Sequence, residues 1–251
     1  MVVTLLGTGT SHGIPVIGCD CKVCTSHDSH DKRYRSSIML EEMGKHLVID
    51  TGYEFRLQLL RENVTSLDGV LYTHSHTDHC AGLDDLRVFS RHNSFPIYGD
   101  EQTLFTLKKR YPYAIDNGEH PGLPVLKSNV LAPYKEVEIA RIKVVPIPVY
   151  HGNNLIYGYR FGTFAYLTDV SDIPDESYVA LKGVKLLVLG ALRERPHSTH
   201  FSFSQAYQAA RKIGVAKVYF THINHETCYS DINRLYPGFV ESAYDGLVIN
   251  I

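Results

Sequence analysis

The sequence predicts an α+β fold in which two β-sheets pack face to face and helices cover their outer sides. Short apolar runs with strand character recur along the 251 residues, and runs of strands followed by a helix occur twice. No linker or low-complexity segment interrupts the chain. We therefore expect one domain over residues 1–251, although the apolar pattern by itself establishes only a mixed α and β class.

The first half of the chain opens on an expected strand at residues 2–6. A glycine-rich turn at residues 7–13 follows, and it lacks the Gly-Lys-Ser/Thr end of a phosphate-binding loop. Residues 111–134 contain four prolines and are predicted to form an insertion. Loops of this length often act as lids or binding loops. Further strands are expected at residues 36–39, 45–49 and 69–73, and helices at residues 53–62 and 102–110.

The second half alternates apolar runs with polar turns, and one helix is expected at residues 203–213. Strands are expected at residues 141–149, 156–161, 163–168, 185–190, 216–220 and 247–249.

The composition limits the classes of function. The 25 basic and 27 acidic residues give a net charge of -2, which argues against broad nucleic-acid binding. No apolar stretch approaches the roughly 18 residues of a membrane span. The chain opens directly on a strand without a signal peptide, so we expect a cytoplasmic protein whose five cysteines stay reduced.

Four metal-binding side chains lie within six residues of one another, directly after the strand expected at residues 69–73. They are His74, His76, Asp78 and His79. A strand end points residues 74 and 76 in the same direction, and the turn that follows can bring residues 78 and 79 to a second point. The spacing therefore predicts two adjacent metal sites.

The remaining ligands of such a site are expected at the ends of later strands. His151, Asp169 and His222 each follow an apolar run, and side chains at such ends are often held rigidly for binding. A capping or core role would explain any one of them alone. Their shared position favours metal binding.

A second cluster places three cysteines, Cys19, Cys21 and Cys24, within six residues. In a reducing compartment this spacing indicates a zinc site rather than disulfides. Tetrahedral structural zinc takes four ligands, and we expect His225 to be the fourth. The competing candidates for the fourth position are His27, His30 and Cys228.

The H-x-H-x-D-H spacing, together with the later strand-end ligands, resembles the metallo-β-lactamase superfamily. The resemblance extends from Thr4 to about Thr227. It implies a four-layer αββα sandwich with a dinuclear metal site. By that resemblance one metal is held by His74, His76 and His151, and the other by Asp78, His79 and His222. Asp169 bridges the two metals, and Asp50 orients the cluster without binding metal.

Within that superfamily the chain resembles the subgroup of the phosphoribosyl 1,2-cyclic phosphate phosphodiesterases of the carbon–phosphorus lyase pathway. This likeness implies hydrolysis of a small cyclic phosphate, such as that ester or a 2′,3′-cyclic nucleotide, by a hydroxide that bridges the metals. The leaving alkoxide needs a proton. We predict that His200 supplies it, with His197 as the alternative.

The resemblance leaves other activities open, because one fold supports several chemistries. The alternatives are a tRNA 3′-processing nuclease, a thioester or lactone hydrolase, and a metal-binding module without activity. We expect two divalent ions in the active site (zinc or manganese, with iron(II) also compatible) and one structural zinc. The expected partner is a small phosphodiester, with nucleic acid disfavoured and no membrane. Members of this family commonly dimerise, so the resemblance makes a homodimer one candidate assembly, while the sequence itself does not define the oligomeric state.

Overall fold

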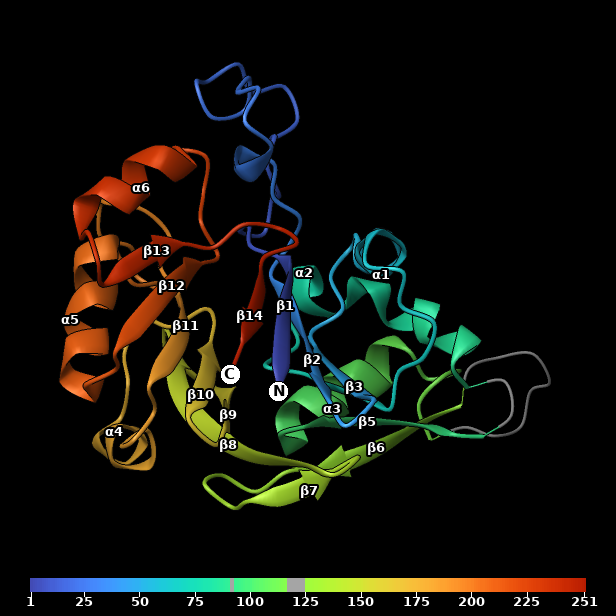
Figure 1. Ribbon diagram of the computed structural model, residues 1–251. Coiled ribbons are helices and arrows are strands. Elements are labelled where there is room, and N and C mark those ends of the chain that lie inside the picture. The colour runs from blue at the N-terminus through green and yellow to red at the C-terminus, as the bar shows by residue number, and fades with distance from the viewer. Residues whose placement is uncertain (91–92, 117–124) are drawn as a thin grey trace.

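The computed structural model describes residues 1–90, 93–116 and 125–251, and it contains two seven-stranded sheets that lie against each other (Figure 1). The strand order of the first sheet is β14-β1-β2-β3-β4-β5-β6, and that of the second is β13-β12-β11-β10-β9-β8-β7. The strands of the first sheet are β1 (Val2–Gly7), β2 (Ser37–Glu42), β3 (Lys45–Ile49), β4 (Gly69–Leu71), β5 (Phe95–Gly99), β6 (Leu126–Val130) and β14 (Val248–Asn250). Those of the second are β7 (Val137–Ile139), β8 (Ile142–His151), β9 (Asn154–Phe161), β10 (Phe164–Leu167), β11 (Leu186–Gly190), β12 (Lys217–Thr221) and β13 (Val240–Ser242).

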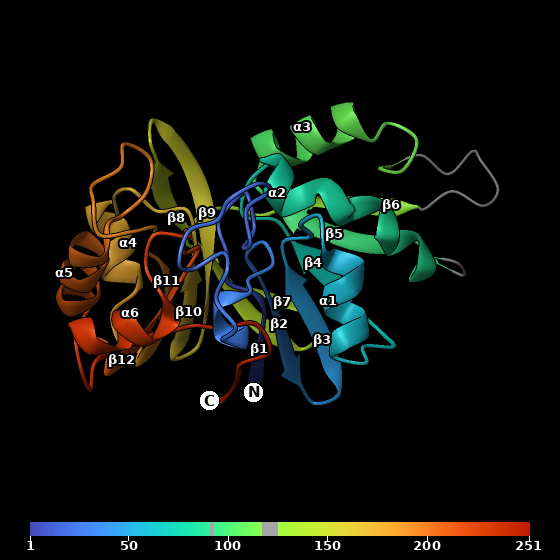
Figure 2. The same cartoon turned by 90° about the horizontal axis from the view of Figure 1, so that it is seen from above.

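Helices cover the outer face of each sheet, as Figure 2 shows from above. On the first sheet these are α1 (Phe55–Arg61), α2 (Thr77–Cys80), η2 (Ala81–Val88) and α3 (Glu101–Arg110). On the second sheet they are α4 (Asp175–Ala180), α5 (Phe203–Ile213) and α6 (Tyr229–Leu235). A single turn of 3₁₀ helix, η1 (Ser29–Asp31), lies in the N-terminal loop. The predicted αββα sandwich is therefore confirmed.

The two sheets share one apolar core. Buried side chains of β1 to β4, such as Leu5 and Ile38, belong to the same cluster as Tyr159 of β9 and Tyr166 of β10. The hydroxyl of Tyr159 donates a hydrogen bond to the backbone oxygen of Tyr72 at 2.6 Å, which ties the second sheet to the end of β4. The segment that carries the histidine cluster thus rests on the interface of the sheets.

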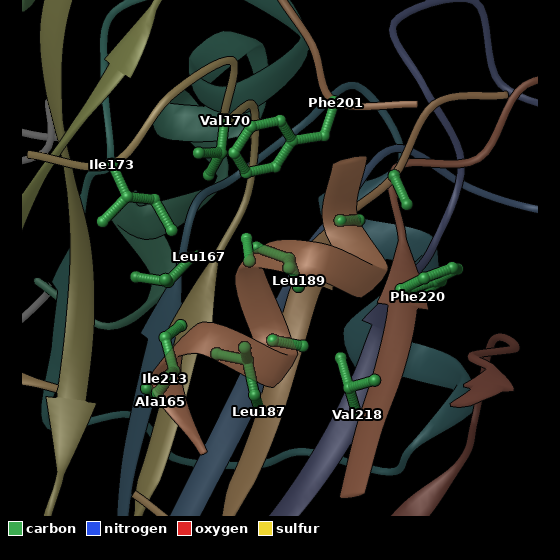
Figure 3. Close-up of a cluster of buried hydrophobic side chains, with 14 of the residues drawn as sticks. Ala165, Leu167, Val170, Ile173, Leu187, Leu189, Phe201, Ile213, Val218 and Phe220 are labelled. Atoms are coloured by element: carbon green, nitrogen blue, oxygen red, sulfur yellow. The ribbon is translucent and has the colours of Figure 1, made fainter. Parts of the chain in front are cut away.

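The outer face of the second sheet packs against α5 (Figure 3). Ser202 begins this helix with a capping box, in which its hydroxyl accepts from the backbone N–H of Gln205 and its own N–H donates to the Gln205 side chain. Gly214 ends the helix in the left-handed conformation that glycine adopts without strain. Phe201, directly before the cap, packs on Val170 of the neighbouring turn. This packing fixes the loop that contains residues 197–200.

The prediction that residues 111–134 form an insertion is wrong for its C-terminal part. Residues 126–130 are β6, which pairs in parallel with β5 at the edge of the first sheet. The strand was not recognised in the sequence because it is mostly polar, and an edge strand need not alternate regularly between apolar and polar residues. Residues 117–124 lie outside the described part of the chain.

Several short elements were also missed by the sequence analysis, namely β5, β7, β13, α2, α4 and α6. Each has fewer than eight residues, too short for a clear apolar period.

In the described ranges no helix is long and apolar enough to cross a bilayer.

Candidate metal centre

The candidate ligands gather where strands of both sheets end. Asp50 follows β3, the segment 72–79 follows β4, His151 ends β8, Asp169 lies just beyond β10, and His222 follows β12. Three of these residues have a left-handed backbone, with φ of 65° at Asp50, 55° at Asp169 and 57° at His222. Such a conformation is costly for residues other than glycine and recurs at functional sites. It turns each side chain inward at the point where its strand stops.

One group of donors consists of His74, His76 and His151, whose ring nitrogens lie close enough together to hold a single ion. The ring centroid of His76 lies 4.5 Å from that of His74 and 5.1 Å from that of His151. Oδ2 of Asp169 faces this group, at 3.9 Å from Nε2 of His74 and 4.0 Å from Nε2 of His151.

A second group forms around the other oxygen of the same carboxylate. Oδ1 of Asp169 lies 3.3 Å from Nε2 of His79 and 3.0 Å from Nδ1 of His222. Asp78 completes the group, with its Oδ2 at 3.3 Å from Nε2 of His79. The structure thus brings all seven predicted ligands together at Asp169. The first predicted set forms one donor group. In the second, His222 groups with Asp78 and Asp169, while His79 groups with His74 and Asp169.

Asp50 supports the cluster from behind. Oδ2 of Asp50 lies 2.7 Å from Nδ1 of His79. The backbone N–H of Thr73 donates to Oδ1 of Asp50, and the hydroxyl of Thr73 donates to Oδ2, each at 2.8 Å. The sequence analysis expected this orienting role. It missed Thr73, whose hydroxyl also lies 2.9 Å from Nδ1 of His74.

The rings of His151 and His222 are held in similar ways. Nδ1 of His151 lies 2.8 Å from the backbone oxygen of Thr199, and Nε2 of His222 lies 3.2 Å from the hydroxyl of Thr10. Partners of this kind fix ring orientation and tautomer in metal sites. No signal in the sequence distinguishes Thr199 or Thr10 from other polar loop residues.

The donor set fits divalent metal ions. Nε2 of His74 and Nε2 of His79 are buried and have no hydrogen-bond partner within the described residues, which is costly unless a ligand satisfies them. Burial opposes the charged form of His79, yet the carboxylates of Asp169, Asp78 and Asp50 together hold its pKa well above the usual value. A site with such an excess of buried carboxylate charge is suited to cations.

His200 lies against this cluster, whereas His197 lies farther out and is exposed. The ring of His200 stacks on His222 at 4.9 Å and meets His151 edge-on at 4.8 Å. Burial lowers the pKa of His200 to about 3, with Asp169 opposing the shift, so its ring is neutral before substrate binds. The position of His200 fits its predicted role as the general acid. For that role, a bound anion must raise the pKa of the His200 ring.

A separate group of four donors joins the N-terminal loop to the segment after β12. Nδ1 of His225 lies 3.3, 3.4 and 3.6 Å from the sulfurs of Cys19, Cys21 and Cys24. Burial alone would raise the pKa of the Cys21 thiol, but the N–H of Cys24 and the ring of His225 help lower it to about 6. Thiolate is the form that binds zinc. The competing candidates His27, His30 and Cys228 lie outside this group.

Replacing Cys21 by serine is expected to lower the melting temperature by several degrees and to remove about one metal ion per chain, because structural thiolate sites contribute directly to folding. Calorimetry and elemental analysis of metal-loaded protein measure both effects. Cys228→Ser is the matched control, since Cys228 packs beside Cys24 but is not one of the four donors. Equal losses in both variants, or only two ions per chain in the loaded wild type, would contradict the site.

Comparison with known proteins agrees with this geometry. The sequence profile of the beta-lactamase superfamily domain matches residues 45–223, which contain every candidate ligand of the catalytic cluster. The chain belongs to the metallo-β-lactamase superfamily.

Two crystal structures of the metallo-β-lactamase fold match the chain over almost its full length. A new diphosphatase from the PhnP family is 41% identical, with a TM-score of 0.90 and coverage of 99% of this chain and 96% of that one. Zinc-bound PqqB from Methylobacterium extorquens shares the fold at 18% identity, with a TM-score of 0.81 and full coverage of both chains. The predicted likeness to the phosphodiesterase subgroup is therefore confirmed at the level of the family.

A curated relative, an octanoyltransferase from Porphyromonas gingivalis (strain W83), is 38% identical over 246 residues. The match covers 97% of this chain, but the chain spans only about half the length of that relative.

The matched domain contains the His/Asp cluster, whose donor groups could hold metal ions. A cavity of about 390 Å³ opens beside the first ligand group. It is lined by His74, His76, His151, Asp100, Gln102 and Asn153 among others. The sequence analysis did not identify Asp100, Gln102 or Asn153, because single polar residues in turns carry no distinctive spacing.

Proposed function

We propose that this protein is a dinuclear phosphodiesterase that hydrolyses small phosphorylated molecules, with five-membered cyclic ribose phosphates as the first class to test. The observation that supports this proposal most directly is the bridging position of Asp169. Each of its oxygens faces a different group of candidate ligands, at 3.0 to 4.0 Å. Two adjacent ions suit phosphoryl transfer because they can neutralise charge on both the attacking and the departing oxygen.

When bound, the two ions would activate water and stabilise the charge that builds up on phosphorus. The side chains of this protein carry out the other tasks. Asp50 and Thr73 orient the rings of His79 and His74. His200 lies at the edge of the cluster, where its ring nitrogen can hydrogen-bond the phosphoryl group or the departing oxygen.

The similar solved structures support phosphorus chemistry over the other activities of the fold. The 41%-identical relative is a diphosphatase, and a diphosphatase cleaves a phosphorus–oxygen bond as a phosphodiesterase does. The small cavity of about 390 Å³ and the net charge of -2 favour a small substrate over a tRNA precursor.

A thioester hydrolase is the second candidate, and one observation favours it. The 38%-identical relative carries the name octanoyltransferase, and octanoyl groups are carried as thioesters. Because this chain spans half of that relative, the acyl-transfer activity can reside in either half. An octanoyl thioester therefore belongs in the substrate panel.

A screen of metal-reconstituted protein is expected to give the highest kcat/KM on a ribose cyclic phosphate or another small phosphodiester. The panel contains ribose 1,2-cyclic phosphates, 2′,3′-cyclic nucleotides, bis(p-nitrophenyl) phosphate, a tRNA precursor, an octanoyl thioester and a β-lactam. Protein stripped with a chelator should lose every activity and regain it with zinc or manganese. Faster turnover of the tRNA precursor or of the thioester would reverse the proposal.

A further inference from the structure

One ligand of the His/Asp cluster lacks the support that the others have. The other four histidines each have an oxygen atom of a neighbouring residue within 3.2 Å of a ring nitrogen. The ring of His76 has no such partner within residues 1–90, 93–116 and 125–251, and the residue is exposed. The orientation of His76 therefore depends on the backbone that carries it.

The backbone directly before His76 is held by the end of α3. Nη1 of Arg110, the last residue of that helix, donates to the backbone oxygen of Ser75. The same nitrogen donates to Sγ of Cys80 at 3.5 Å, and the thiol of Cys80 donates to the Ser75 oxygen at 3.5 Å. These contacts close residues 75–80 into a loop that contains three of the candidate ligands.

The helix gives Arg110 a rigid base. Asp100 caps the first turn of α3, where its carboxylate accepts from the N–H of Thr103 at 2.9 Å. Leu107, three residues before Arg110 and therefore on the same side of the helix, is fully buried in one apolar cluster with Cys80. The helix thus packs against the end of the ligand loop, and its last residue reaches that loop from a fixed position.

The positive charge of Arg110 is not used in an ion pair. In the described ranges Arg110 has no carboxylate partner, and its acceptors there are the oxygen of Ser75 and the sulfur of Cys80. A hydrogen bond from a charged donor to a carbonyl is stronger than one between two neutral groups. Arg110 can therefore fix the peptide that precedes His76 more firmly than a neutral side chain would.

We propose that Arg110 is a positioning residue for the first ligand group: it holds the backbone of Ser75 so that His76 faces the other two histidines of that group. Loss of Arg110 would leave His76 free to turn away, and the ion of this group would bind more weakly. The ring of His79 does not need this support, because Asp50 already holds it. The inference rests on the two-ion centre of the proposed function and adds a residue outside its ligand set.

Titration of metal-free protein with cobalt(II) tests the inference, because the two kinds of site absorb differently. Cobalt bound by thiolates gives strong charge-transfer bands in the near ultraviolet, whereas His and carboxylate ligands give only weak visible bands. Arg110→Met keeps a side chain of similar length and removes the guanidinium. It is expected to raise the dissociation constant of one visible-band ion by about 10–100-fold, the usual cost of removing a group that orients a metal ligand. The thiolate bands should not change.

Tyr111→Phe is the matched control. Tyr111 follows Arg110 in the chain, and its hydroxyl donates to the backbone oxygen of Cys80 at 3.3 Å, at the other end of the same loop. Removing that bond should leave cobalt binding unchanged, because the ligand beside it, His79, is held by Asp50. Arg110→Lys, which keeps the charge but loses the planar fork, should recover part of the affinity.

A double-mutant cycle shows whether Arg110 acts through His76. His76→Ala removes the ligand itself, so Arg110→Met should add little to the loss of cobalt affinity in that background. Thr10→Val removes the hydroxyl beside the ring of His222. In that background Arg110→Met should cause the same loss as in the wild type, because the two changes affect different ligands.

Activity gives a second measurement. A positioning role predicts that excess metal restores the kcat of Arg110→Met on bis(p-nitrophenyl) phosphate, whereas a residue that touches the substrate would stay defective at saturating metal. The melting temperature of the metal-free variant should stay close to that of metal-free wild type, because the role of Arg110 lies in ion binding. If Arg110→Met does not fold, Arg110→Gln is the second neutral variant for the same titration.

Several results would overturn the inference. Unchanged cobalt affinity in Arg110→Met, or a full additional loss in the His76→Ala background, would show that Arg110 does not position His76. An equal loss in Tyr111→Phe, or an equal fall in melting temperature with and without metal, would assign Arg110 a structural role. A wild type without the visible cobalt bands would refute the two-ion centre and the proposed function as well.

Discussion

Replacing Asp169 by asparagine is expected to lower kcat by about 10²–10³-fold, the loss found when one electrostatic stabiliser of a transition state is removed. The reason is geometric. Oδ1 of Asp169 faces His79 and His222, whereas Oδ2 faces His74 and His151. An amide keeps the shape but presents one oxygen and no charge, so one of the two ligand groups loses its shared donor. The metal content should fall by about one ion per chain.

Asparagine is the informative substitution here because the backbone of Asp169 is left-handed, with φ of 55°. Asparagine tolerates that conformation, whereas alanine would add backbone strain to the loss of the ligand. Asp175→Ala is the control, since the carboxylate of Asp175 is 93% exposed on α4. Normal turnover with full metal content in Asp169→Asn would refute the two-metal arrangement.

Replacing His200 by alanine is expected to lower kcat on a ribose cyclic phosphate by about 10²–10⁴-fold, the range for loss of a general acid. The loss on bis(p-nitrophenyl) phosphate should be much smaller, because p-nitrophenolate leaves without a proton. In the substrate-free protein burial holds the pKa of His200 at about 3. The acid role therefore depends on the negative charge of the bound phosphate, which favours the protonated ring.

His197→Ala is the matched control for this experiment. The two rings lie 5.3 Å apart, but His197 is exposed and belongs to no candidate ligand group. Metal analysis must show unchanged content in His200→Ala, because the ring of His200 also lies near Asp169 and His151. Equal losses on both substrates would assign His200 to phosphate binding. A leaving-group-dependent loss in His197→Ala alone would identify His197 as the acid.

The candidate site was largely predictable from the sequence because its ligands follow a local rule. His74, His76, Asp78 and His79 are fixed by their spacing within one strand end and turn. The later ligands share a position after an apolar run, and strands of a sheet tend to bring such positions to one edge. The sequence does not reveal which oxygen of Asp169 faces which ligand group. That assignment depends on the left-handed turn after β10 and on how the two sheets meet.

The edge of the first sheet shows where sequence reasoning failed. The strand β6 reads Leu-Lys-Ser-Asn-Val, and only Leu126 is fully buried. Its identity as a strand comes from pairing with β5, in register from Phe95 opposite Leu126. Such pairing is a tertiary effect that outweighs local propensity. Similarly, only the fold decides among the four candidates for the fourth ligand of the cysteine group, by bringing residue 225 to residues 19–24.

The short segment of residues 221–225 carries a donor for each of the two candidate ion-binding regions. His222 belongs to the His/Asp cluster and His225 to the cysteine group. Backbone hydrogen bonds between Ile223 and both Thr8 and Thr10 attach this segment to the N-terminal loop. An ion that orders one end of the segment lowers the cost of ordering the other, and by thermodynamic reciprocity the reverse also holds. Metal uptake should therefore be cooperative, so that a half-loaded sample contains fully loaded and empty chains in preference to a random mixture.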